Sequence, residues 1–160
     1  MSRETSQIQR EIKQTKPFRS LAQEAAISLL RTADLLRRRI EGVMTSNDVT
    51  PQQYNVLRIL RGAGTAGLPT LEIGERMIEQ APGVTRLLDR LEIKRLVRRE
   101  RCLHDRRQVL CYITEAGLEL LAALDDPVDQ ADEGAMSGLS KAEIKTLIGL
   151  LDKLRAIHRE

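Results

Sequence analysis

The sequence contains few aromatic residues and few cysteines, and both shortages narrow the possible functions. Only 2% of the 160 residues are aromatic, and none is Trp. Proteins that bind single-stranded nucleic acids stack the bases on aromatic rings, so this chain offers little for that mode of binding. The two cysteines, Cys102 and Cys111, do not form a CxxC pair. They predict neither a metal site nor a cofactor.

Long apolar segments and catalytic motifs are also missing. No run approaches the roughly 20 apolar residues that cross a bilayer, and the polar N-terminus lacks the apolar centre of a secretory signal. We therefore predict a cytoplasmic protein with reduced thiols and no membrane contact. The chain has two histidines and shows no nucleophile motif, phosphate-binding glycine loop or ligand cluster. It is not expected to be an enzyme.

Positive charge is concentrated in one part of the chain. The net charge is +3, but residues 81–107 contain nine Lys or Arg and four Asp or Glu, a net charge of +5, which leaves −2 for the rest. A positive field on one structural unit is what attraction to a polyphosphate requires. A solvated charged face is the alternative interpretation. The shortage of aromatic rings makes duplex DNA the favoured nucleic-acid partner.

Two long amphipathic stripes lie on either side of this basic segment. Apolar residues recur every three or four positions over residues 18–43, with Pro17 expected in the first helical turn. A second stripe covers residues 144–157, after a capping box formed by Ser140 and Glu143. The two helices could close a monomeric core or build a two-fold dimer, and the pattern alone leaves both open. The candidate dimer contacts are Phe18, Leu21, Leu29, Leu147, Leu151 and Leu154.

Between the stripes, the pattern predicts three helices. Residues 50–53 (TPQQ) are a strong start signal for a first helix, which residues 62–64 (GAG) end. Thr70 is expected to cap a short helix over residues 71–77. After a short turn, Pro82 opens a helix with one apolar face and one basic face. Two helices joined in this way are typical of a helix-turn-helix.

The period then changes from helical to alternating. Residues 97–101 and 109–113 predict two strands of a hairpin, with His104, Asp105, Arg106 and Arg107 at or near its tip. A helix fits the major groove of DNA, while a thin basic hairpin can enter the minor groove, whose negative potential favours arginine. Asp105 could pair with a nearby arginine and fix its geometry, or it could be an ordinary turn residue.

Several runs in this region closely resemble MarR-type transcriptional regulators. They are residues 75–76 (ER), 84–92 (VTRLLDRLE), 96–97 (LV), 105–107 (DRR) and 110–117 (LCYITEAG). The resemblance covers about residues 50–120 and implies a mainly α (α+β) winged helix-turn-helix with N- and C-terminal dimerisation helices. The implied organisation is a lead-in and dimerisation helix (residues 1–46), a DNA-binding lobe (47–117), and a linker helix with a second dimerisation helix (118–160).

The resemblance also implies which residues contact DNA. Asp105 and Arg107 match the family's Asp-x-Arg wing motif, which makes Arg107 the minor-groove probe, with Arg106 beside it. The start and outward face of the recognition helix are Gln80, Ala81, Gly83, Thr85, Arg86 and Arg90. Two positions depart from the family pattern. Ala81 lacks the side-chain oxygen of a capping Ser or Thr, and Arg95 replaces a Gly that ends the helix in a left-handed turn.

The sequence therefore predicts a homodimeric transcription factor, a repressor, that binds a pseudo-palindromic operator. The resemblance also implies that a small-molecule effector, bound between the dimer helices and the DNA-binding lobe, could release the protein from DNA. One alternative is a winged-helix module that binds proteins and not DNA. Another is a thiol-based redox sensor that uses Cys102 or Cys111, which lie on opposite wing strands and offset along them. The competing interpretation is that both cysteines are structural and serve as small apolar side chains.

Overall fold

The computed structural model describes residues 6–80, 83–102, 105 and 108–158. Two compact units follow each other along the chain, Met1–Arg39 and Ile40–Glu160. The functional division at residues 46 and 117 stays a prediction. Three candidate site residues, Ala81, Arg106 and Arg107, lie outside the described residues.

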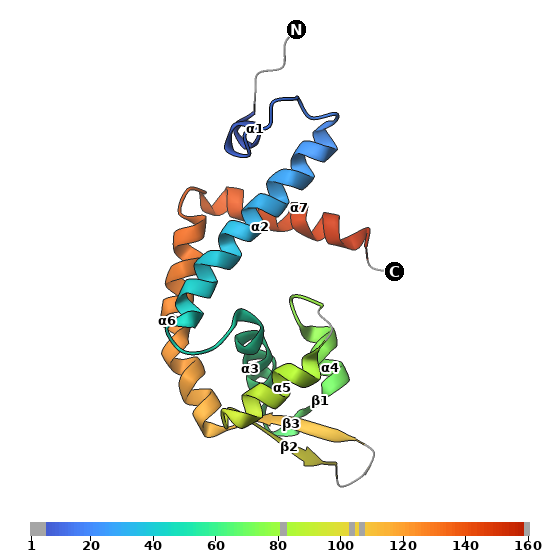
Figure 1. Cartoon of the computed structure of the whole chain (residues 1–160), viewed down its shortest axis with the longest axis vertical. Coiled ribbons are helices and arrows are strands. Elements are labelled where there is room, and N and C mark those ends of the chain that lie inside the picture. The colour runs from blue at the N-terminus through green and yellow to red at the C-terminus, as the bar shows by residue number, and fades with distance from the viewer. Residues whose placement is uncertain (1–5, 81–82, 103–104, 106–107, 159–160) are drawn as a thin grey trace. The chain divides into compact units, whose positions relative to one another are not determined.

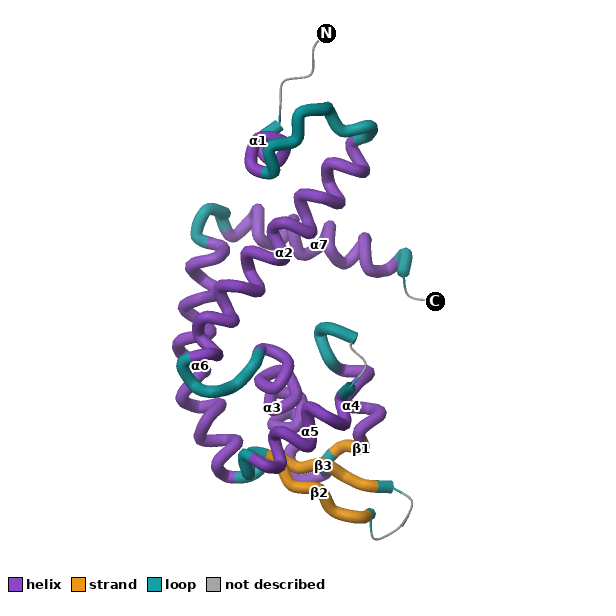
Figure 2. Tube along the Cα trace, in the orientation of Figure 1, coloured by secondary structure: helices purple, strands orange, loops and turns teal. Residues whose placement is uncertain are grey.

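Helices dominate the described residues, together with one small sheet, which confirms the predicted fold class (Figures 1 and 2). The elements are α1 (Gln7–Glu11), α2 (Leu21–Thr45), α3 (Pro51–Ala63), the 3-10 turn η1 (Gly64–Ala66), β1 (Leu68–Pro69), α4 (Thr70–Arg76), α5 (Val84–Ile93), β2 (Val97–Arg101), β3 (Val109–Ile113), α6 (Glu115–Met136) and α7 (Lys141–Ala156).

The long helix α2 begins later than the sequence pattern indicates. Ser20 Oγ accepts a hydrogen bond from the Gln23 N–H at 3.1 Å, an N-cap contact that fixes the start at Leu21. The expectation that Pro17 lies in the first helical turn is therefore wrong. Phe18, predicted on the helical stripe, precedes the helix and is buried. Leu21 and Leu29, which do lie on the helix, are exposed.

The second unit has one continuous apolar core. The end of α2, helices α3, α4 and α5, the sheet and the first part of α6 all contribute side chains to it. The fully buried side chains are Met44, Val56, Leu57, Leu60, Ile73, Leu88, Leu91, Val97, Cys111, Leu121 and Leu124. At the start of α3, Thr50 and Gln53 form the predicted capping box, with both hydrogen bonds at 3.1 Å. Gly64 follows α3, so the predicted end of that helix is also confirmed.

The sheet contains the predicted hairpin and one additional strand. β2 and β3 are antiparallel, with Arg99 opposite Cys111. The strand order is β1-β3-β2, so β2 lies at an edge. β1 consists of Leu68 and Pro69 and pairs with the other side of β3. A two-residue strand that contains proline shows no alternating pattern, which explains why the sequence did not predict it.

Two helix starts in the predicted helix-turn-helix differ from the structure. Thr70 is the first residue of α4 and not its cap, and its Oγ1 lies 4.0 Å from the Cys111 Sγ. The predicted cap at Thr70 is therefore wrong, because the hydroxyl faces the sheet. α5 begins at Val84, two residues after the predicted start, and Gly83 precedes it with a φ of 115°.

The C-terminal part of the second unit consists of two helices. α6 has 22 residues and contains Pro127. The predicted capping box at the start of α7 is confirmed, since Glu143 N–H donates to Ser140 Oγ at 3.3 Å and Ser140 N–H donates to Glu143 Oε2 at 2.8 Å. The structure describes every residue of α7, and none of them is buried. No helix among the described residues has the length and apolar character to cross a membrane.

Candidate nucleic-acid interface

Helix α5 has a buried face and a charged outward face, as its sequence predicts. Leu88 and Leu91 are completely buried in the core. Arg86 and Arg90 are exposed on the other side, one turn apart, and Ile93 extends that face with 82% of its surface accessible. The core therefore anchors the helix along its length and leaves two guanidinium groups free to meet a ligand.

The other predicted recognition residues lie around the start of this helix. Gln80, Gly83 and Thr85 are all exposed. Gly83 adopts a left-handed conformation, which glycine reaches without the strain that a side chain would bring. Ala81 lies outside the described residues, so the effect of its missing cap oxygen stays a prediction.

The described part of the wing is closed by two backbone hydrogen bonds. Gln108 N–H donates to Asp105 O and Cys102 N–H donates to Gln108 O, each at 2.9 Å. Cys102 therefore lies opposite Gln108 and not opposite Cys111, which confirms the predicted offset of the two cysteines along the wing. Asp105 is exposed at this end of the hairpin. The roles assigned to Asp105, Arg106 and Arg107 stay predictions.

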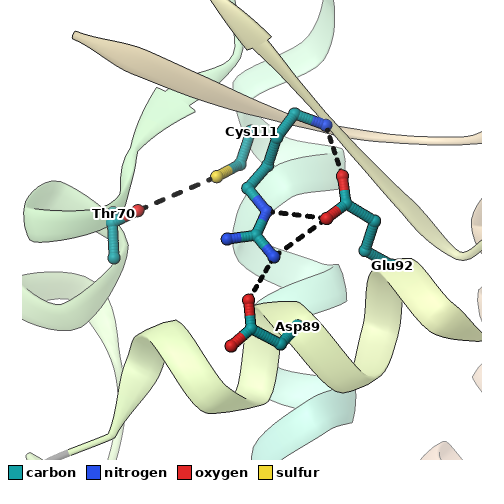
Figure 3. Close-up of polar contacts among 5 residues, drawn as sticks. Thr70, Asp89, Glu92 and Cys111 are labelled. Carbon is teal, nitrogen blue, oxygen red and sulfur yellow. Dashed lines mark hydrogen bonds and ion pairs between the residues drawn. The ribbon is translucent and has the colours of Figure 1, made fainter. Parts of the chain in front are cut away.

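An ion-pair cluster, which we call the Arg99 clamp, joins the wing to α5. It consists of Arg99 on β2 and of Asp89 and Glu92 on α5, and Figure 3 shows both carboxylates reaching up from the helix. Arg99 Nε donates to Glu92 Oε2 at 3.0 Å, and Nη2 contacts Glu92 Oε2 at 2.9 Å and Asp89 Oδ1. The hydrogen bond that Arg99 donates to Asp89, followed by the attraction of the Glu92 charge, raises the pKa of Arg99 although partial burial opposes this.

Sequence reasoning missed this clamp. It counted Asp89 and Glu92 as acids that weaken the positive segment and Arg99 as one more phosphate-binding candidate. The available signal was the three-residue spacing of the two acids, which places them on adjacent turns of one helix. No sequence rule indicates which strand residue they face.

The ion pairs separate the basic residues of this region into two groups. Lys94 pairs with Asp48 at 2.9 Å, Arg98 pairs with Glu100, and Arg99 is in the clamp. Four exposed arginines make no ion pair with any residue in the described part of the chain: Arg86, Arg90, Arg95 and Arg101. The positive charge that remains available therefore lies on the outward face of α5, at its end, and on the neighbouring wing strand.

Helix α5 ends in the left-handed turn that the sequence placed in question. Arg95 has a φ of 59°. Its N–H donates to Glu92 O, and the Leu96 N–H donates to Leu91 O, both at 2.9 Å. This pair of bonds is a Schellman motif, which usually has Gly at the left-handed position. The chain therefore forms the left-handed turn that the resemblance implies, with an arginine in a strained conformation.

This turn is tied to the start of α6. Thr114 Oγ1 donates to Arg95 O at 2.7 Å and accepts from Gly117 N–H at 3.2 Å, so one hydroxyl serves the turn and the helix cap. A Cβ at Gly117 would lie 2.5 Å from Leu96 O, which only glycine avoids. The end of α5 is thus fixed to the start of α6.

The two cysteines differ in their surroundings. Cys111 is completely buried, and burial raises the pKa of its thiol although the Thr70 hydroxyl acts against this. Because the thiolate is the reactive form, Cys111 is poorly suited to sense oxidants. Cys102 is partly exposed, and both are free thiols. The redox alternative is left with Cys102 alone.

Comparison with known proteins assigns this architecture to a family. A sequence profile of the MarR family matches residues 47–108. The HTH-type transcriptional regulator TtmR of Methylorubrum extorquens is 30% identical over 136 residues, which are 85% of this chain and 68% of that regulator. A MarR transcription factor from Planctomyces limnophilus is 40% identical, with a TM-score of 0.66 over 85% of this chain and 98% of the solved one. The chain belongs to the MarR family.

A further solved structure adds a functional context to this MarR-family regulator. A mutant MarR from E. coli complexed with operator DNA is 25% identical, with a TM-score of 0.75 over 84% of this chain and 98% of that one. The fold is thus the winged helix-turn-helix of the family, as predicted. The expectation that the chain is not an enzyme is also confirmed, since these relatives are transcription regulators.

Proposed function

We propose that this MarR-family regulator binds double-stranded operator DNA with α5 in the major groove and the wing against the adjacent minor groove. The observation that carries the proposal is the outward face of α5. It presents Arg86 and Arg90, which form no ion pair with any residue that the structure describes, on a helix whose opposite face is buried in the core. The E. coli relative with the same fold is complexed with operator DNA.

The chemistry of these side chains suits the two grooves. A guanidinium group donates two parallel hydrogen bonds to the O6 and N7 of guanine or binds a phosphate. Arg86 and Arg90 have this capacity, and Arg101 extends the basic surface onto the wing. From the Asp-x-Arg motif, we assign the minor-groove contact to Arg107, with Asp105 and Arg106 beside it.

We further propose that the regulator acts as a two-fold homodimer. Helix α7 carries a line of apolar side chains, of which Ile148, Leu150 and Leu154 are exposed, and Ile157 directly after the helix is exposed as well. A partner subunit would cover them, with Leu147, Leu151 and the α2 residues Leu21 and Leu29 as further contacts. Two-fold symmetry presents two α5 helices to the two halves of a pseudo-palindrome. Sedimentation equilibrium should then give twice the chain mass of 18.1 kDa.

We also propose that the protein is a cytoplasmic repressor and that a small-molecule effector releases it from DNA, as the family resemblance implies. In the N-terminal unit, α1 and α2 line an open pocket of about 390 Å³, with Gln7, Glu24 and Arg31 among its residues. Its volume is within the range of sites for small ligands. An effector would act by binding more tightly to a dimer shape that does not fit the operator.

Selection of bound sequences from a pool of random duplexes tests the proposal. We expect a two-fold symmetric consensus, with affinity that falls steeply as salt rises, by a log-log slope of about −0.9 for each phosphate contact. Arg86→Ala and Arg107→Ala should each weaken operator binding at least tenfold, or about 1.4 kcal/mol. Lys145→Ala, which removes an exposed charge from α7, is the control and should bind like the wild type. A winged helix that binds only proteins would enrich no sequence.

A further inference from the structure

We propose that Arg99 is a positioning residue that fixes the angle between the wing and α5, and that the clamp sets operator preference more than overall attraction to DNA. This inference rests on the proposed function. It assigns a role to Asp89, Glu92 and Arg99, none of which is among the predicted DNA contacts.

The contacts of the clamp fix direction as well as distance. The Arg99 side chain is 22% exposed, against 50% for Asp89 and 42% for Glu92. Its planar guanidinium group reaches two carboxylates on successive turns of α5 at once (Figure 3). A single ion pair would allow rotation about its axis, whereas two separate acceptors define an orientation.

The backbone of Arg99 takes part in the same clamp. β2 is an edge strand, and the Arg99 N–H donates to Glu92 Oε1 at 3.2 Å and not to β3. An edge strand presents unpaired backbone groups that a side chain can satisfy. Glu92 therefore binds β2 at both the backbone and the side chain, which ties the strand itself to the recognition helix.

Charge alone does not account for the two acids. The clamp contains two carboxylates and one guanidinium group, so it carries a net −1 on the helix whose outward face holds Arg86 and Arg90. Without Asp89 and Glu92 the helix would attract phosphates more strongly. What the acids contribute is the geometry of the wing.

Small changes at the clamp are amplified at the end of the wing. Asp105 is six residues beyond Arg99, at most about 20 Å along an extended strand. A rotation of about 10° at Arg99 would then displace that end by up to about 3.5 Å, more than a hydrogen bond tolerates. Loss of the clamp should therefore cost contacts at the wing while the charges of the lobe stay in place.

The test compares Asp89→Ala/Glu92→Ala with a charge-matched control, Asp129→Ala/Glu133→Ala, which removes two exposed acids from α6. Affinity is measured for the selected operator and for a scrambled duplex of the same length at one salt concentration. We expect the clamp variant to bind the operator at least fivefold more weakly and the scrambled duplex as well as or better than the wild type. Its Arg99 amide hydrogen should exchange at least tenfold faster. The control should keep the wild-type ratio of affinities and the wild-type exchange rate.

Arg99→Lys is a second variant that keeps the charge and removes the planar fork. An intermediate ratio of operator to scrambled affinity, with an unchanged unfolding midpoint, supports positioning. An unchanged ratio in Asp89→Ala/Glu92→Ala overturns the inference, and so does an unchanged exchange rate of the Arg99 amide. If the wild type itself shows no preference for any duplex, the proposed function fails. The exchange rate then still decides whether the clamp holds the wing.

Discussion

The winged lobe and helix α7 lie in the same compact unit but treat their apolar side chains in opposite ways. In the lobe, Leu57, Leu88 and Leu91 are completely buried, and the core continues through all its elements. In α7, which is described throughout, no side chain is buried, and Leu150 is 58% exposed. Burial of a leucine contributes about 1.5–3 kcal/mol, so the lobe gains within one chain what α7 does not. The lobe buries its apolar side chains within one chain, whereas α7 leaves its own exposed, and this is the surface that we propose a second subunit covers.

The largest effect is expected when one leucine in the core of the lobe and a matched, exposed leucine on α7 are each shortened to alanine. Leu91→Ala should lower the free energy of unfolding by about 2–5 kcal/mol, because it removes buried methyl groups and leaves a void. Leu150→Ala in α7 is the matched substitution, and at protein concentrations too low for dimers it should change stability by less than about 0.5 kcal/mol. Urea unfolding followed by circular dichroism measures both. Equal losses in the two variants would show that α7 is packed as tightly as the lobe.

The elements that the sequence predicted well are those whose signals are local. The hairpin strands follow from alternation over five residues each, and the two capping boxes follow from side chains three positions apart. Where a distant contact decides, the prediction was wrong. Thr70 faces Cys111 on β3, 41 residues away, and does not cap α4. The start of α2 was wrong for another reason, because the local cap of Ser20 on Gln23 was overlooked in favour of Pro17.

The same distinction applies to the candidate site. The outward position of Arg86 and Arg90 follows from the helical period, and the structure confirms that both are exposed. The clamp could not be predicted, because Asp89 and Arg99 meet only when the turn at Arg95 brings β2 back across α5. The count of basic residues in the sequence therefore overestimated the positive charge that is available to bind DNA.

Arg95 offers a way to strengthen the lobe without touching α7. A left-handed conformation costs an L-residue about 1–2 kcal/mol. Glycine avoids this cost, but it loses more conformational entropy on folding, which offsets part of the gain in stability. We expect Arg95→Gly to raise the free energy of unfolding by about 0.5–1 kcal/mol. Thermal unfolding of the variant measures this directly.

The control for Arg95→Gly is Arg90→Gly, in the interior of α5, which should lower stability by about 1 kcal/mol. Both variants lose an arginine, so opposite changes in the free energy of unfolding would show that the effect at Arg95 comes from the left-handed turn. A loss of stability in Arg95→Gly would mean that the arginine side chain contributes more than the strain removes.

The smallest expected effect is at the ion pair that joins the lobe to α6. Arg61 on α3 contacts both carboxylate oxygens of Asp125 at 2.9 and 3.1 Å. The hydrogen bonds from Arg61, with its charge adding to them, lower the pKa of Asp125. A carboxyl group whose pKa is lower in the folded chain stabilises the fold above its unfolded pKa of about 3.9, and this contribution disappears as the pH falls through the folded value.

Arg61→Ala should therefore lower stability near pH 7 and have no effect once Asp125 is protonated, below the folded pKa. Both side chains are a third or more exposed, so solvent screens the pair and the loss should be only about 0.2–1 kcal/mol. Chemical denaturation of wild type and variant at several pH values between 2 and 7 measures the difference. Glu143 in α7 also has a lowered pKa, held by Ser140 and not by a cation, so it should respond to acid equally in both proteins and cancel from the difference. A gap between wild type and Arg61→Ala that stays constant down to pH 2 would mean that Arg61 stabilises the lobe by packing and not through Asp125.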